Sequence, residues 1–159
     1  MVLDECTAAW RMLPHAIRQR IQLVCLPMLD RDENAAIVNA IQRHAAIVVQ
    51  KSLAEGFGLT VVEAMWKARP VIGSAVGGIE DQLVDGESGL LLDPPTDLDA
   101  FGVALERLLS DRAFAERLGQ NAHQRALELF LGNRHLIQYA NLFATSRYAE
   151  PVSQSASAH

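Results

Sequence analysis

The feature that most constrains the fold is a continuous run of apolar, mostly β-branched residues at 45–49. A run without polar residues at alternate positions is typical of a strand that is covered on both faces, as strands are in parallel sheets. Further strands are predicted at 21–26, 71–73 and 89–92, and segments with helical periodicity separate them. This alternation predicts an α/β fold, in which a Rossmann-like parallel sheet has helices on both faces.

The helices are predicted from apolar stripes at helical spacing and from the residues that begin them. Helical patterns lie between and after the strands, at 34–43, 61–68 and 79–84, after the candidate N-cap Thr96, and throughout the segment after Ser110. At 159 residues the chain is long enough for one well-packed core. We therefore expect a single domain over residues 1–149 and a flexible polar tail over residues 150–159.

Composition and charge argue against several classes of protein. The net charge of −5 disfavours a general nucleic-acid surface, and no apolar run approaches the roughly 20 residues of a membrane span. The N-terminus has no basic region followed by an apolar stretch, so it predicts no signal peptide. We expect a cytoplasmic protein with two reduced thiols, Cys6 and a buried Cys25. The five histidines show no metal-ligand spacing, so no metal site is predicted.

The candidate site is the segment 55–63, which closely follows strand 45–49 and has a glutamate at each end. One interpretation of this segment is purely structural. Thr60 and Glu63 have the spacing of a capping box, in which the Thr60 side chain accepts from the Glu63 N–H and the Glu63 side chain reaches back. Gly56 and Gly58 would then serve only a strand-to-helix turn.

The other interpretation of the same segment is a ligand site. In parallel α/β sheets, ligands bind beyond the carboxyl ends of the strands, which is where this segment is expected. Gly56 and Gly58 allow a ligand to approach the backbone, and N–H groups around Leu59 open a helix whose positive dipole end can hold a diphosphate. Glu55 would accept from sugar hydroxyls and Glu63 from a ribose diol, so one site would bind a nucleotide sugar.

Residues 55–65 resemble the E-x7-E motif of retaining GT-B glycosyltransferases of the glycogen synthase and sucrose synthase type, family 4 of the glycosyltransferases. Three later segments, 68–72, 76–79 and 84–91, resemble the next strand of this family, its Gly-Gly loop and its D-G-x-x-G strand, in the same order and spacing. The resemblance covers roughly residues 20–145. Within the family, residues 31–34 and 50–58 are most similar to trehalose synthases, which join an NDP-glucose to glucose.

The resemblance implies a role for each residue of the segment. Glu55 would contact the hydroxyls of the donor sugar, and we assign it to binding and electrostatic stabilisation rather than to covalent attack. The other positions would contact the rest of the donor, UDP-glucose or ADP-glucose: the sugar through Gly56, Phe57 and Gly58, the diphosphate through Leu59 and Thr60, and the ribose through Glu63. Lys51 either assists the phosphates or is a solvated lysine. Such enzymes retain the anomeric configuration and need no metal or other cofactor.

The resemblance also implies that parts of a whole enzyme are missing. A family-4 enzyme binds its sugar acceptor in an N-terminal domain, and its C-terminal domain opens with two strands and with the Arg and Lys that neutralise the diphosphate. We therefore expect the C-terminal half of a GT-B fold without its first two strands, inactive as an isolated chain. Met1 is either a native start or the result of a truncation. The apolar edge of strand 45–49 would then pair with strand 21–26 or with a second copy in a homodimer.

Other functions remain open from the sequence. A different family-4 hexosyltransferase would carry the same motif, and so would a trehalose phosphorylase, which binds free phosphate and no nucleotide. A non-catalytic nucleotide-sugar-binding or interaction module would keep the fold and Glu63 but have no turnover. An unrelated flavodoxin-like domain would need a Gly-rich phosphate loop after strand 21–26, and no such loop follows it.

Overall fold

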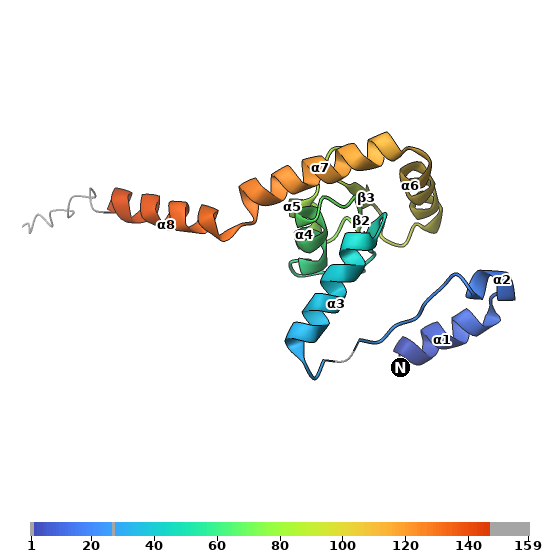
Figure 1. Ribbon diagram of the computed structural model, residues 1–159. Helices are drawn as coiled ribbons and strands as arrows, with labels where there is room; N and C mark the ends of the chain where they lie inside the picture. Colours follow the sequence, from blue (N-terminus) through green and yellow to red (C-terminus); the bar gives the residue numbers. More distant parts are fainter. Residues whose placement is uncertain (1, 27, 147–159) are drawn as a thin grey trace, which may run out of the picture. The chain divides into compact units, whose positions relative to one another are not determined.

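The computed structural model describes residues 2–26 and 28–146 (Figure 1). The chain divides into two compact units, Met1–Ala40 and Ile41–His159, which are described separately below. The expected tail at 150–159 lies outside the described residues. No helix of the described chain is long and apolar enough to cross a membrane.

The first unit consists of short helices joined by an extended segment. It contains α1 (Val2–Met12), α2 (His15–Arg18) and the first part of α3 (Arg31–His44). The guanidinium of Arg18 lies 5.4 Å from the centre of the Trp10 ring, a cation–π contact. Helix α3 is preceded by Asp30, whose side chain accepts hydrogen bonds from the N–H groups of Asp32 and Glu33 at 2.9 and 3.1 Å.

The strand predicted at 21–26 is wrong. These residues form no strand, and most of their side chains are exposed, including Leu23 and Val24. An apolar run becomes a strand only where a neighbouring strand supplies backbone partners, and the described residues of this unit contain none. The predicted pairing of 21–26 with strand 45–49 is therefore wrong too. Cys25 was expected to be buried but is exposed; Cys6 and Cys25 are both free thiols.

The second unit contains a three-stranded parallel sheet, which confirms the predicted fold class. Its strands are β1 (Val48–Gln50), β2 (Val71–Ser74) and β3 (Leu90–Leu92), in the order β1-β2-β3. Val48 pairs with Val71 in one ladder and Ile72 pairs with Leu90 in the other. Within the described residues β1 pairs only with β2, so its other edge is open.

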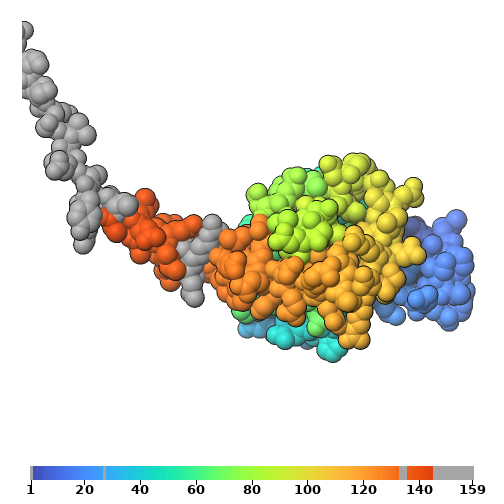
Figure 2. Space-filling model, turned by 90° about the horizontal axis from the view of Figure 1, so that it is seen from above, coloured from blue at the N-terminus to red at the C-terminus, as the bar shows by residue number. Residues whose placement is uncertain are grey.

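Helices cover both faces of this sheet. These are α4 (Leu59–Trp66), α5 (Gly78–Gln82), α6 (Leu98–Ser110) and α7 (Arg112–Leu129). The last helix, α8 (Gly132–Ser146), contributes no described residue to either core cluster. Val71 and Ile72 are adjacent in β2 and therefore point to opposite faces. Val71 packs in a cluster with residues of α4, α5 and α7, whereas Ile72 packs with residues of α6, α7 and β3. Figure 2 shows the outer surface of α7 in orange, beside the green and yellow segments of the same unit.

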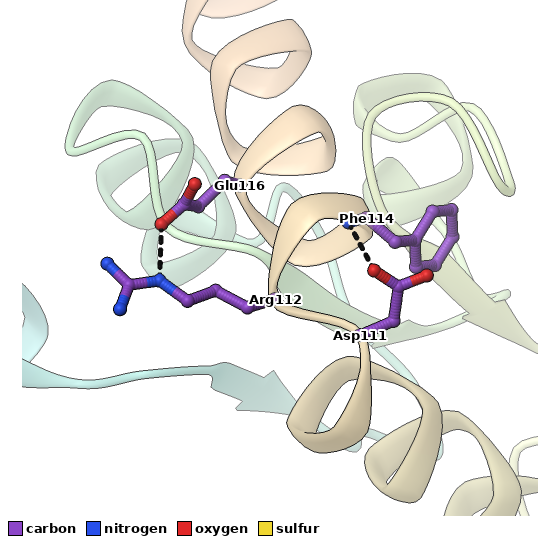
Figure 3. Close-up of polar contacts among 4 residues, drawn as sticks. All are labelled: Asp111, Arg112, Phe114 and Glu116. Carbon is purple, nitrogen blue, oxygen red and sulfur yellow. Dashed lines mark hydrogen bonds and ion pairs between the residues drawn. The ribbon is translucent and has the colours of Figure 1, made fainter.

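The helices α6 and α7 begin at aspartates. Asp97 accepts a hydrogen bond from the Ala100 N–H at 2.8 Å, so the cap of α6 is Asp97 and not the predicted Thr96. An Asp side chain is at least as good an N-cap as Thr, and α6 starts one residue later than a Thr96 cap requires. Asp111 accepts from the Phe114 N–H at 2.9 Å and starts α7 in the same way (Figure 3).

Candidate functional site

The loops that follow the three strands meet at the carboxyl edge of the sheet. Strand β1 ends at Gln50, β2 at Ser74 and β3 at Leu92. The backbone N–H of Gly78, after β2, donates to the carbonyl of Gly56, after β1, at 3.0 Å. The ammonium of Lys51 donates to the carbonyl of Pro95, after β3, at 2.7 Å. The segment 55–63 therefore lies where parallel sheets bind ligands.

Glu55 is half-buried, and both of its carboxylate oxygens receive hydrogen bonds. The N–H of Gly56 donates to Oε1 at 3.0 Å, and the side-chain amide of Gln50 donates to Oε2 at 3.4 Å. The same amide donates to the Ser52 hydroxyl at 2.9 Å. Gln50 is the last residue of β1, so the strand itself orients Glu55. Gln50 was not predicted from the sequence, although its place directly after a predicted strand was a usable signal.

The Gly77–Gly78 loop packs directly on the backbone of the segment. A Cβ at Gly77 would lie 1.9 Å from the Glu55 carbonyl oxygen, and one at Gly78 would lie 2.5 Å from the Gly56 carbonyl oxygen. Gly77 also has φ of 52° with ψ of −135°, a conformation that only glycine adopts readily. Because Gly77 and Gly78 have no side chains, this loop can pack against the backbone of Glu55 and Gly56 and hold it in place.

The backbone carbonyl of Phe57 is held by a buried glutamine. The side-chain amide of Gln82 donates to the Phe57 carbonyl oxygen, and Gln82 is fully buried. The guanidinium of Arg125 in turn donates to the carbonyls of Gln82 and Asp81, at 2.7 and 2.9 Å. The ring of Phe57 is half-exposed and meets Phe130 edge-on, with ring centres 6.3 Å apart. No local sequence signal marked Gln82 as a contact of this site.

The helix α4 begins at Gly58 and not at a capping box. Gly58 is the N-cap, with φ of 79° and ψ of 54° in the left-handed region, and no side chain caps the helix. The N–H groups of Val61 and Val62 bond to the Gly58 carbonyl, so those of Leu59 and Thr60 belong to the first-turn donors that lack an acceptor inside the helix. The predicted capping box is wrong, because the left-handed glycine starts the helix before Thr60.

Glu63 has a different partner, the buried side chain of Gln42 at the end of α3. The Nε2 of Gln42 donates to Oε2 of Glu63 at 3.1 Å. The ammonium of Lys67 donates to Oε1 of Gln42 at 2.6 Å and to the backbone carbonyl of Glu63 at 3.2 Å. Partial burial lowers the pKa of Lys67, the charge of Glu63 opposes this shift, and the nearby cation Arg43 adds to it.

A cavity of the second unit lies at the opposite end of the strands. It is a cavity of about 370 Å³, lined by Ala46 and Pro70, which precede β1 and β2, and by residues at the junction of α6 and α7. At its rim Arg112 and Glu116 form an exposed ion pair of 2.7 Å (Figure 3), and this hydrogen bond raises the pKa of Arg112. This cavity includes none of the predicted site residues. Among the described residues, no three His, Cys, Asp or Glu side chains are grouped as metal ligands.

Comparisons with known proteins give the family. Residues 21–125 match the family Glycosyl transferases group 1. The trehalose synthase of Thermococcus litoralis is 45% identical over 112 residues, which are 69% of this chain and 26% of that protein. The chain thus spans about a quarter of the length of the trehalose synthases that it matches.

Solved structures agree with this family and define the fold. Sucrose-phosphate synthase from Thermosynechococcus elongatus has a TM-score of 0.64 at 33% identity, over 85% of this chain and 35% of that one. HepE from Anabaena, solved in complex with UDP-glucose, has a TM-score of 0.61 at 22% identity, over 68% of this chain and 30% of that one, and supports the fold alone. The chain therefore belongs to the group 1 glycosyltransferase family, and its sheet and helices form part of a GT-B fold.

Proposed function

We propose that this chain is the donor-binding part of a retaining glycosyltransferase of the trehalose synthase type, with an NDP-glucose as its donor. The observation that carries the proposal is the meeting of the segment 55–63 with the Gly77–Gly78 loop at the carboxyl edge of the sheet. The 45% identity to a trehalose synthase supports the subfamily. The family membership itself supports a transferase.

The diphosphate of the donor would bind at the start of α4. There the N–H groups of Leu59 and Thr60 have no acceptor within the helix, and the positive end of the helix dipole favours an anion. Gly56 and Gly58 carry no side chain that would keep a phosphate from this backbone. Phe57 would contribute backbone contacts to the sugar, although its carbonyl is already bonded to Gln82.

The two glutamates would bind the hydroxyl groups at either end of the diphosphate. Glu55, held by Gln50 and the Gly56 N–H, would accept from the sugar hydroxyls and stabilise positive charge at the anomeric carbon in the transition state. Glu63, one turn into α4, would accept from the ribose diol. In this proposal the leaving phosphate takes the proton of the acceptor. Lys51 is bonded to the Pro95 carbonyl and would have to leave it to reach a phosphate.

A binding experiment separates this function from its alternatives. We expect UDP or ADP to shift the ¹⁵N–¹H signals of residues 55–63 in a titration of the isolated chain. Glu63→Gln should weaken this binding about tenfold, because a hydrogen bond to a charged group is lost, while Glu116→Gln at the other end of the sheet should not. If inorganic phosphate shifts these signals and neither nucleotide does, the chain is instead part of a phosphorylase. If no nucleotide binds, the proposed function is wrong.

Catalysis by the isolated chain is not expected. The chain spans about a quarter of the length of its trehalose synthase relatives. In this proposal the acceptor site and the cations that neutralise the diphosphate would lie in segments outside the match. Release of UDP or ADP from the sugar nucleotide with glucose as acceptor should therefore be undetectable, and measurable turnover would contradict this. A larger protein that contains this chain but has no turnover either would indicate a non-catalytic binding module.

Two further parts of the proposal concern the surroundings of the chain. The free thiols Cys6 and Cys25 fit the expected cytoplasmic location, where thiols stay reduced. The expected homodimer would cover the open edge of β1, but the comparisons with relatives give it no support. Sedimentation velocity tests this last point, and a monomer at high protein concentration would rule the homodimer out.

A further inference from the structure

Gln42 is a buried polar residue whose side-chain amide has a partner at each end. It is 5% exposed and is the one residue described as buried in α3. Its amide has one donating and one accepting end, and each has a partner: Nε2 donates to Glu63 Oε2 and Oε1 accepts from Lys67 Nζ. Burial of an amide costs free energy unless both ends are paired, so this arrangement resists rotation of the side chain.

Lys67 determines which way the Gln42 amide faces. An ammonium group has donors only, so the end of Gln42 next to it must be the carbonyl. The NH₂ end then faces Glu63 and can only donate to its carboxylate. Lys67 also donates to the backbone carbonyl of Glu63 one turn earlier, which fixes the ammonium on α4. The direction of the Gln42–Glu63 hydrogen bond therefore depends on Lys67.

This network engages one oxygen of Glu63. Oε2 accepts a hydrogen bond from Gln42, and Glu63 as a residue is exposed. A carboxylate that is held at one oxygen presents the other in a defined direction. Two adjacent hydroxyls are best recognised by such a preoriented acceptor, because less rotational freedom is lost when they bind.

We propose that Gln42 and Lys67 are positioning residues for the ribose of the donor nucleotide. They do not contact the nucleotide; they hold Glu63 so that its other oxygen, Oε1, accepts from the ribose diol. Lys67 acts through Gln42, and Gln42 acts through Glu63. This inference rests on the proposed function, in which Glu63 binds the ribose.

The test measures the preference for a ribose diol. Each variant is titrated with UDP and with 2′,3′-dideoxy-UDP (or the adenine pair, if ADP binds better), and the ratio of the two Kd values is compared. In the wild type we expect a ratio of about 10 or more. Lys67→Met should reduce this ratio at least threefold and leave the Kd of the dideoxy nucleotide unchanged. Lys67→Arg, which keeps the positive charge and the donors, should retain most of the preference.

Two other variants control for misfolding and for the loss of a positive charge as such. Gln42→Glu has nearly the same shape but places a carboxylate beside Glu63, so it should also reduce the ratio and covers the case in which Lys67→Met does not fold. Arg112→Met removes a cation at the opposite end of the sheet and should change neither Kd. The side-chain amide signals of Gln42 should move in Lys67→Met and stay in Arg112→Met.

The possible results separate the ribose role of Glu63 from the positioning role of Gln42 and Lys67. A wild-type chain that binds both nucleotides equally, or binds neither, refutes the ribose role of Glu63, and the positioning role with it. A wild-type preference that Lys67→Met and Gln42→Glu both retain refutes the positioning role alone. A loss of affinity for both nucleotides by the same factor would show that the network merely supports the fold.

Discussion

Gly77→Ala tests whether the loop after β2 really holds the backbone of the candidate site. Two costs add at this position. A positive φ costs an L-residue about 1–2 kcal/mol, and the Cβ would lie 1.9 Å from the Glu55 carbonyl oxygen, so the loop must also shift at a further cost of about 1–3 kcal/mol. We expect Gly77→Ala to lower the free energy of unfolding by about 2–5 kcal/mol.

Two other glycines separate these costs. Gly86 has φ of 71° but no atom within 4 Å of an added Cβ, so Gly86→Ala should cost only about 1–2 kcal/mol. Gly102 lies inside α6 with an ordinary φ and open space, so Gly102→Ala should stabilise by about 0.5–1 kcal/mol. The three substitutions add the same methyl group and are expected to differ in size and in sign.

The assay is urea unfolding followed by the fluorescence of Trp66 in a Trp10→Phe background, because Trp10 belongs to the first unit. The shift in midpoint multiplied by the m-value gives each change in stability. A Gly77→Ala variant no less stable than Gly86→Ala would refute the close contact between the loop and Glu55. A Gly77→Ala chain that is also unable to bind a nucleotide would connect the same contact to the site.

Two further predictions concern the end of α4. Ala68 has φ of 53°, so Ala68→Gly should relieve about 1–2 kcal/mol of strain, offset by about 0.5–1 kcal/mol of chain entropy, and raise the unfolding midpoint; a lower midpoint would contradict this. The pKa of Lys67, one of the two lysines, should lie below the usual value of 10.5 when it is measured from the ¹³Cε chemical shift. Because the unfolded chain then binds this proton more tightly, Lys67 makes the free energy of unfolding rise with pH between the two pKa values, and Lys67→Met should remove that slope.

Much of the second unit was predictable because its signals are local. The run at 45–49 predicted β1 to within a few residues, and the later apolar runs predicted β2 and β3. The same kind of run at 21–26 did not form a strand, because a strand needs partners that no local pattern supplies. Thr60 and Glu63 had the spacing of a capping box, yet Gly58 starts the helix earlier in a left-handed conformation.

The residues that support the candidate site were not predictable in this way. Gln82 holds the Phe57 carbonyl across 25 positions of sequence, and Lys67 reaches Gln42 across the same separation. Gln50 was closer, five positions before Glu55. A glutamine on a helix has the same local pattern whether it is solvated or buried against a distant carbonyl, so only the packing of the elements decides its role.

By itself, the sequence determined the parallel α/β architecture, the place of the two glutamates after strand β1, and the family to which they belong. It could do so because apolar periodicity and motif spacing depend on residues close together in the chain. Only the tertiary structure decided that Glu55 is held by Gln50 and by a glycine loop, and that Glu63 faces Gln42 instead of capping its own helix. Those contacts join different elements of the fold, and they exist because the sheet and its helices bring buried polar groups together that must satisfy one another.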